Sequence, residues 1–263
     1  MLTLYDNPFS PFARKVRMVL RFKGLEYRSI DALALAEHDR LVRVNPRAEV
    51  PVLVDGSVTV ADSADILSYL EDRFPKPTAL PTSPELRAKA RRWQRVADTV
   101  LDAIIHDISI WIWPTHHRSD EPPPGLLDAG RGELHEILAE LERSIDVSGF
   151  VCDQLSIADF SLFPHLSSLK PLGVVLEEAT HPNLLRWNRQ MRMQTAVRED
   201  LEYVKRSAME KFASGQSPYE DEKVVWRGDR IEWLLAHGFR DWLVSEFEHG
   251  RAVVAARHQG AAR

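Results

Sequence analysis

The chain has 263 residues, a formal net charge of -5 and a sequence pI near 6.1, so it lacks the basic character of a nucleic-acid-binding domain. Its content of 44% hydrophobic and 28% charged residues is that of a globular protein with room for two modest domains. The single cysteine, Cys152, excludes an intramolecular disulfide and suits a reducing compartment.

The sequence shows neither a targeting signal nor a membrane segment. The N-terminus has no basic region ahead of an apolar run, which a secretory signal would have. No uninterrupted apolar stretch approaches the ~20 residues that a membrane-spanning helix needs. We therefore expect a cytoplasmic protein that binds neither nucleic acid nor membranes.

A strand, a turn and a helix are predicted first. Residues 2–5 form a short apolar strand, and apolar residues then recur at helical spacing at Phe12, Val16, Val19 and Leu20. Ser10 suits the N-cap of this helix, and Pro11 suits its first position. These residues alone leave two interpretations open. Ser10 is either a plain cap, or part of a helix N-terminus that holds an anion or a thiolate.

The rest of the N-terminal third predicts two further strand regions and a helix. Gly24 is placed to end the first helix, residues 27–30 read as a strand, and residues 31–47 are polar, with at most one helical turn. Two β-branched runs joined by Asp55-Gly56 indicate a hairpin over residues 50–60.

Asp62 or Ser63 caps the next helix, which the prolines at 75 and 77 end. The order strand, helix, strand, loop, hairpin, helix is typical of an α/β thioredoxin-like domain. We assign it to residues 1–76, followed by a linker over residues 77–84.

Three short motifs in this region resemble the cytosolic glutathione transferase superfamily in its serine-type form: Ser10-Pro11-Phe12, Val50-Pro51 and Asp62-Ser63. The resemblance implies that Ser10 is the catalytic residue, beside the sulfur of glutathione as co-substrate. It implies that Val50 and a cis Pro51 align the cysteinyl backbone of the tripeptide, as an added strand would. It implies that Asp62 and Ser63 hold the γ-glutamyl end.

A serine hydroxyl can activate a thiol without a histidine. A thiol has a pKa near ~8.5, and lowering it by about two units requires about 2.7 kcal/mol. A hydrogen bond to a charged partner contributes roughly 1.5–3 kcal/mol, and a helix N-terminus adds about 0.3–1 kcal/mol. These terms suffice, and the lack of a cysteine near Ser10 argues against disulfide exchange on the enzyme.

Two residues depart from the family pattern. Glu49, which precedes Val50-Pro51 and which we include in the site, would repel the glycine carboxylate of glutathione if it pointed inward. Asp62 stands where many relatives have the longer Glu. The candidates for offsetting the charge of Glu49 are Arg14, Arg47 and His38, each otherwise a solvated surface group, and the sequence does not choose among them.

Residues 85–204 are predicted to form an all-helical domain. Apolar residues recur at helical spacing from Glu85 to Trp113, which gives a rod of about 43 Å. A second helix is predicted over residues 128–146. Ser156 and Asp159 form a capping box before an apolar run, and Ser-x-Ala-Asp at this place resembles the folding motif of glutathione transferases. The fold class is therefore a thioredoxin-like domain followed by a helical domain.

By resemblance, a pocket for the second substrate lies between the first helix and the long helix. We expect it to be lined by Phe12, Trp111, Trp113 and the loop 115–124, unless these aromatic residues are ordinary core or interface residues. His116-His117 lacks ligand partners at suitable spacing, so we expect no metal. Gly130-Arg131-Gly132 lacks a third glycine and a preceding strand, so it is no dinucleotide motif.

Residues 205–263 form an extension beyond the resemblance. A helical stripe runs through it: Ile231, Leu234, Leu235, Phe239, Trp242, Leu243 and Phe247. Such a stripe must bury against something. Two alternatives are open: the stripe packs on its own helical domain, across the mouth of the site, or it packs against a dimer mate or another protein. A hinge is expected at residues 215–218, and in the first case the extension narrows the substrate pocket.

The resulting expectation is a homodimeric glutathione transferase that uses the thiolate held at Ser10 to attack a small hydrophobic electrophile, as in detoxification. Conjugation and reductive thioether chemistry share this first step, and the sequence does not separate them. The alternative is a protein of the same fold without catalysis, acting as a binding or scaffold module through its extension. A stress or regulatory protein that binds glutathione without turnover lies between the two.

Overall fold

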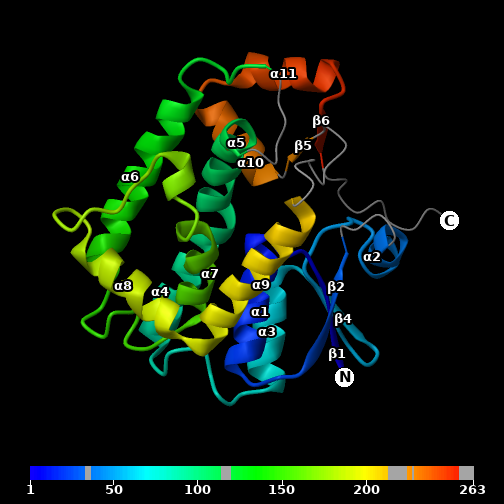
Figure 1. The fold of residues 1–263 in the computed structure, drawn as a ribbon, viewed down its shortest axis with the longest axis vertical. Helices are drawn as coiled ribbons and strands as arrows, with labels where there is room; N and C mark the ends of the chain where they lie inside the picture. The colour runs from blue at the N-terminus through cyan, green and yellow to red at the C-terminus, as the bar shows by residue number, and fades with distance from the viewer. Residues whose placement is uncertain (33–36, 114–119, 213–223, 227, 255–263) are drawn as a thin grey trace.

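The computed structural model describes residues 1–32, 37–113, 120–212, 224–226 and 228–254. A small sheet with flanking helices forms the N-terminal part, a set of helices covers one side of it, and the C-terminal extension lies at the far end of those helices (Figure 1). None of the described helices is long and apolar enough to cross a membrane.

The N-terminal part follows the predicted order. Its elements are β1 (Leu2–Asp6), α1 (Pro11–Phe22), β2 (Tyr27–Asp31), α2 (His38–Val44), β3 (Val52–Asp55), β4 (Val58–Ala61) and α3 (Ser63–Arg73). The sheet order is β2-β1-β3-β4, with β1 and β2 parallel and the other pairs antiparallel. Helices α1 and α3 cover the face toward the helical half, and α2 lies on the other side (Figure 1). The segment predicted as loop with one helical turn thus contains a seven-residue helix.

Strand register brings the ends of three strands to one edge of the sheet. Tyr5 of β1 pairs with Val52 of β3, and Val52 pairs in turn with Ala61 of β4. The loop after β1, the residues before β3 and the residues after β4 therefore meet at the same edge. This is where the sequence places Ser10, Val50-Pro51 and Asp62-Ser63.

The hairpin turn lies one residue later than predicted. Asp55 pairs with Val58, so the two-residue loop is Gly56-Ser57 rather than Asp55-Gly56. Gly56 has φ 61° while Ser57 does not have a positive φ, as a type II′ turn requires. Only a glycine takes this first position without strain, and for this reason the loop is fixed around Gly56.

The long predicted helix is present but contains a π-helical turn. It consists of α4 (Pro84–Val96), a π-helical turn (Ala97–Leu101) and α5 (Asp102–Ile112). The helices that pack around it are α6 (Leu126–Ser144), α7 (Ile157–Leu166), α8 (Pro182–Met193) and α9 (Thr195–Phe212). Gly130 of α6 lies close to α5: a Cβ there would stand 2.6 Å from the Ile108 side chain. Close packing of α6 on α5 therefore explains the glycine at position 130, which does not belong to a dinucleotide motif.

The capping box begins the most buried helix of the described fold. Asp159 Oδ2 accepts hydrogen bonds from Ser156 N at 2.8 Å and Ser156 Oγ at 2.9 Å. Its Oδ1 accepts from Val151 N at 3.0 Å and from Trp187 Nε1 at 2.9 Å. All ten residues of α7 are buried. The predicted motif therefore orients α7 and joins it to α8 through Trp187.

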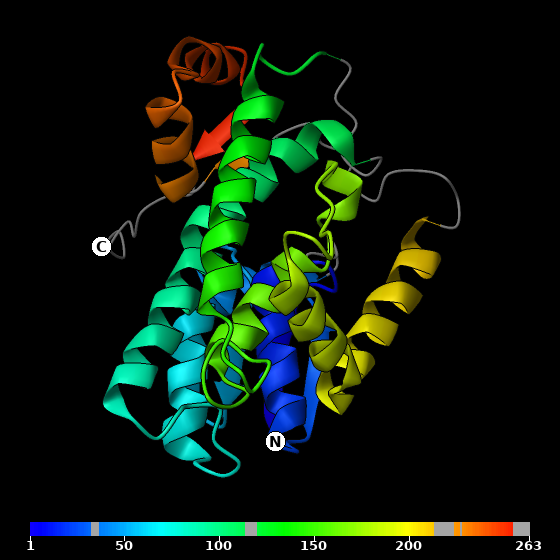
Figure 2. The same ribbon diagram turned by 90° about the vertical axis from the view of Figure 1, so that its left-hand side faces the viewer.

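The extension packs on its own helical half, which is one of the two predicted alternatives. Its first eight residues, 205–212, are the end of α9. The described part beyond α9 comprises β5 (Val224–Trp226), α10 (Gly228–Ala236), α11 (Arg240–Glu248) and β6 (Ala252–Val254), with β5 and β6 parallel. Figures 1 and 2 show α10 and α11 against the end of α5 and α6 that is remote from α3. Trp233 and Leu243 of the predicted stripe are buried, while Leu235 and Phe247 are 49% and 37% exposed. The predicted hinge at 215–218 lies outside the described residues.

Candidate functional site

Ser10 caps α1 at the edge of the sheet where the three strand ends meet. Its Oγ accepts a hydrogen bond from Ala13 N at 3.3 Å. Among the described contacts the hydroxyl only accepts, so its O–H is available to a ligand. Pro11 occupies the first turn of the helix, where an N–H would lack a partner. This is the geometry in which a cap can also donate to an anion.

Asn7 fixes the loop that carries Ser10. Its side-chain Oδ1 accepts from Phe9 N at 2.9 Å and from Ser10 N at 3.2 Å. The buried side chain thus forms an Asx turn immediately before the cap. This role of Asn7 was not predicted from the sequence, although Asn followed by Pro between a strand and a helix is a recognisable turn signal.

Buried charged side chains hold the same loop in place. Arg17 Nη1 and Nη2 donate to the carbonyl oxygens of Asn7 at 3.1 Å and Pro8 at 2.9 Å. Asp6 Oδ1 and Asp200 Oδ1 accept from the same guanidinium. Burial raises the pKa of Asp6, and the positive charge of Arg17 opposes that effect. Nothing in the local sequence indicates that Arg17 is buried.

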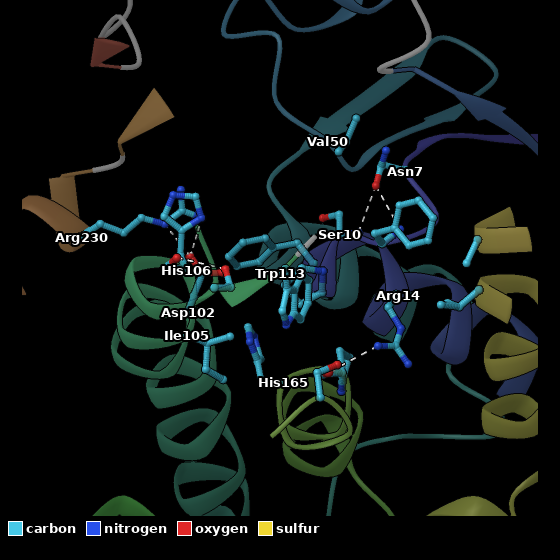
Figure 3. A pocket seen from close by; sticks show the side chains of 18 of the residues that line it. Asn7, Ser10, Arg14, Val50, Asp102, Ile105, His106, Trp113, His165 and Arg230 are labelled. Carbon is cyan, nitrogen blue, oxygen red and sulfur yellow. Dashed lines mark hydrogen bonds and ion pairs between the residues drawn. The ribbon is translucent and has the colours of Figure 1, made fainter. Parts of the chain in front are cut away.

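Arg14 is not the solvated surface charge that the sequence suggested as one interpretation. It is 5% exposed, and its Nε lies 2.9 Å from Asp200 Oδ2. Its Nη1 donates to the Pro164 carbonyl at 3.3 Å, which places the guanidinium against α7 (Figure 3). Burial lowers the pKa of Arg14, and Asp200 opposes this.

Val50 and Pro51 enter the sheet through a cis peptide bond, as the resemblance implied. Pro51 is buried. Glu49 Oε1 lies 2.9 Å from Arg47 Nη2, and this hydrogen bond raises the pKa of Arg47. Of the three side chains considered as compensating charges, Arg47 therefore neutralises Glu49 directly. The side chain of His38 is outside the described part of the structure.

Asp62 and Ser63 begin α3 beside this proline. Asp62 is the N-cap, and its Oδ1 accepts from Ala64 N at 2.8 Å. Its backbone has φ 75°, a conformation that costs a non-glycine residue energy and is frequently found at ligand sites. Ser63 is 4% exposed.

A cavity of about 490 Å³ opens from Ser10 toward the helical half. Three of the predicted site residues line it: Ser10, Phe12 and Val50. Glu49, Pro51, Asp62 and Ser63 are not among its lining residues but lie along the sheet edge next to it. Its apolar walls come from α1, α5 and α9 and the loop after β1: Phe9, Phe12, Ile105, Trp113, Val204, Ala208 and Phe212.

One face of α5 supplies a polar end to this cavity. Asp102, His106 and Ser109 line it together with Ile105 and Trp113, at the spacing of one helix face. The face begins directly after the π-helical turn, and such turns are frequent at functional sites. Arg230 of α10 reaches the same end (Figure 3). The sequence did not predict these polar residues, because the π-helical turn that orients them toward the cavity has no sequence signature.

Of the residues predicted to line the pocket, Phe12 and Trp113 line the cavity, whereas Trp111 and the described loop residues 120–124 do not. Trp111 is not a lining residue and instead packs on Trp242 of α11, with ring centroids 5.9 Å apart. It thus serves the interface with the extension. Residues 115–119 of the predicted loop, including His116-His117, lie outside the described structure. Among the described residues no group of three potential ligands is placed to hold a metal ion.

Cys152 is remote from this chemistry. Its side chain is fully buried ahead of α7, and burial raises the pKa of its thiol to about 11. A protonated, inaccessible thiol is a poor nucleophile. Cys152 is therefore a structural residue.

Comparison with protein families identifies both halves of the chain. Residues 4–78 match the family model of the glutathione S-transferase N-terminal domain, and residues 124–188 match that of the glutathione S-transferase C-terminal domain. The two matches together cover just over half of the chain. The chain therefore belongs to the glutathione S-transferase family.

Similar proteins include named transferases and a stringent starvation protein. A probable glutathione S-transferase of Nicotiana tabacum is 28% identical over 202 residues, which are 73% of this chain and 84% of that protein. A stringent starvation protein A homolog of Coxiella burnetii is 29% identical over 177 residues, 66% of this chain and 78% of that protein.

A solved structure covers the same region. A glutathione S-transferase from Rhodospirillum rubrum F11 has a TM-score of 0.67 at 29% identity and covers 76% of this chain and 92% of that one. About a quarter of this chain thus lies outside the shared structure.

Proposed function

We propose that the protein is a glutathione transferase in which Ser10 stabilises the thiolate of bound glutathione for attack on a hydrophobic electrophile. The observation that carries the proposal is the Ser10 hydroxyl, which caps α1 as an acceptor and keeps its proton for a ligand. A sulfur beside it meets this donor and the positive end of the α1 dipole. The two effects together approach the roughly 2.7 kcal/mol that a two-unit drop in thiol pKa requires.

The edge of the sheet supports binding of the tripeptide. The cis Val50-Pro51 bond lies immediately before β3, where a peptide backbone can align beside the strand. The N-terminus of α3, with Asp62 and the buried Ser63, suits the charged γ-glutamyl end. The Arg47–Glu49 ion pair removes the repulsion that an isolated Glu49 would exert on the glycine carboxylate.

The cavity beside Ser10 supports the second half of the reaction. Its volume of about 490 Å³ suits a small organic molecule, and its walls are mainly aromatic and aliphatic. Attack by the thiolate forms a carbon–sulfur bond and either displaces a leaving group with its electron pair or adds to an activated double bond. A homodimer is the further expectation from the resemblance. Elution of the chain as a 30.0 kDa monomer at micromolar concentration would contradict it.

A second candidate is a regulatory protein of this fold without turnover. The relative named stringent starvation protein A homolog favours it, and so do the exposed apolar side chains Leu235, Val244 and Phe247 on the extension. Such a protein would act through the surface of α10 and α11 rather than through the cavity.

Calorimetric titration of the full chain with glutathione separates these candidates. The transferase proposal predicts binding at millimolar concentration or tighter, followed by turnover of at least one simple aryl or alkyl halide. The absence of heat at several millimolar glutathione would refute the tripeptide site. Binding without turnover across a panel of electrophiles would support the regulatory candidate.

A further inference from the structure

The extension supplies one wall of the candidate site. Arg230 lines the cavity, although it lies beyond the residues that the two family models match. Its helix, α10, packs on α5 and on the π-helical turn. Figure 3 shows Arg230 and Asp102 at one end of the cavity and Ser10 on the opposite side. A side chain of the extension therefore bounds the cavity at the end remote from Ser10.

Asp102 holds Arg230 in this position. The Nε and Nη2 groups of Arg230 donate to Asp102 Oδ2 at 3.0 and 2.8 Å. The two side chains are only 12% and 5% exposed. A ligand that pushed the guanidinium aside would leave a buried carboxylate without this partner, which is far more costly than breaking an ion pair at the surface. The pair is therefore a stiff barrier, unlike a solvated side chain that a ligand can displace.

A separate contact fixes α10 on α6. Trp233 Nε1 donates to Glu133 Oε2 at 2.5 Å, and His237 Nε2 lies 3.1 Å from the same oxygen. Trp233 also stacks on His237 with ring centroids 4.3 Å apart. None of these three side chains is among the described residues that line the cavity. The attachment of the extension and the barrier at Arg230 can therefore be varied independently.

The cavity wall between Ser10 and this barrier is apolar. Ile105 and Trp113 of the α5 segment line it, together with Phe12 of α1. Each methylene group of a ligand that is buried against such a wall strengthens binding about fourfold. A chain long enough to reach the Arg230–Asp102 pair gains nothing more, because it meets buried charges that already have partners. Affinity should therefore rise with the length of an apolar ligand only up to a limit.

We propose that Arg230, held by Asp102, limits the length of the electrophile, so that the site takes compact apolar molecules and excludes long-chain ones. This inference rests on the proposed function, because it takes the Ser10 end of the cavity as the place of the glutathione sulfur. It makes Arg230, on the part of the chain beyond the family resemblance, a specificity-determining residue.

Binding of a series of S-alkylglutathiones, from methyl to decyl, tests the proposal without requiring turnover. Calorimetric titration of the full chain should show affinity that rises with chain length and then falls within the series. The double variant Arg230→Ala/Asp102→Asn removes the barrier and leaves no buried carboxylate behind. It should bind S-decylglutathione about tenfold more tightly than the wild type does, which corresponds to the burial of roughly two further methylene groups. Arg230→Lys keeps the charge and most of the length, so it should keep the limit.

Trp233→Phe is the matched control, because it removes the contact with Glu133 and leaves Arg230 in place. The limit should persist in this variant. Affinity that rises steadily up to decyl in the wild type would overturn the proposal whether or not the variants fold. An unchanged limit in the double variant, or the same gain in Trp233→Phe, would also overturn it. In each of these cases the glutathione site stays intact. If neither glutathione nor any derivative binds, the proposed function fails and the inference fails with it.

Discussion

Arg17 of α1 and Asp200 of α9 form a buried ion pair, with Nε and Oδ1 2.8 Å apart. Asp200 also binds Arg14 through its other oxygen at 2.9 Å. Because Arg17 holds the Asn7 and Pro8 carbonyls as well, this pair fixes the helix and loop of Ser10 against the helical half. The position of Ser10 therefore depends on a contact between two residues that lie 183 positions apart in the sequence.

Replacing Asp200 should therefore destabilise the whole chain. Asp200→Asn leaves two buried guanidinium groups without their shared carboxylate, and we expect a loss of about 3–5 kcal/mol in the free energy of unfolding. Urea unfolding followed by circular dichroism measures it. Glu199→Gln is the control, because that side chain is 55% exposed and its loss should change stability by less than about 0.5 kcal/mol. Equal unfolding midpoints for the two variants would contradict the importance of this pair.

Replacing Asp159 of the capping box should also strongly lower the stability of the chain. Asp159 accepts four hydrogen bonds with no exposure to solvent, and Asp159→Asn turns an acceptor into a donor that faces other donors. We expect a loss of at least about 2 kcal/mol in the free energy of unfolding. Asp153→Asn, in the same segment but exposed, should be close to neutral. Similar thermal melting of the two variants would show that the box is dispensable.

The raised pKa of the Cys152 thiol predicts that the free energy of unfolding depends on pH in the alkaline range. Below pH 9.0 its thiol is protonated in both states, but between 9.0 and about 11 only the unfolded chain releases the proton. The free energy of unfolding should therefore fall as pH rises through this range, by at most about 1.4 kcal/mol per pH unit.

Cys152→Ala should lack this contribution, so the stability difference between it and the wild type should shrink over the same pH range. Urea unfolding of both proteins at several pH values measures the difference, in which the titration of other groups cancels. A thiol reagent should label the wild type only after unfolding. Rapid labelling of the native chain, or a difference that does not change with pH, would disprove the assignment of a buried, protonated thiol.

The Arg47–Glu49 pair predicts a coupling in glutathione affinity. Arg47→Ala exposes the charge of Glu49 and should weaken binding by about threefold, since both side chains are substantially solvated. The double variant Arg47→Ala/Glu49→Ala should recover most of the loss. Calorimetric titration of the four proteins completes the cycle. Additive losses would mean that Arg47 acts on the ligand directly instead of through Glu49.

The sequence predicts those parts of the fold that depend on local chemistry. Ser10-Pro11 and Ser156 with Asp159 follow from rules about caps that involve neighbouring residues only. The hairpin follows from a similar rule, although its turn lies one residue later than predicted. The motifs at Val50 and Asp62 converge because strand register brings their segments together.

Non-local features could not be predicted in this way. Lys15, 1% exposed, is buried because Asp98 of the helical half reaches its Nζ, at 2.6 Å. The cavity face of α5 depends on a π-helical turn, and Arg230 enters the site from a helix more than a hundred residues away in sequence. Each of these depends on tertiary packing that no short window of sequence contains.

The thiol pKa of bound glutathione tests the central claim, that Ser10 donates to the thiolate, most directly. Ser83→Ala is a matched control, because Ser83 caps α4 ahead of a proline as Ser10 caps α1. Each variant should lose about 1 kcal/mol of stability through its cap.

The ultraviolet absorbance of the thiolate, followed against pH in the complex, gives this pKa. We predict a value about two units below that of free glutathione in the wild type and in Ser83→Ala, and a rise of at least about one unit in Ser10→Ala. An unchanged thiol pKa in Ser10→Ala, with glutathione still bound, would contradict the account.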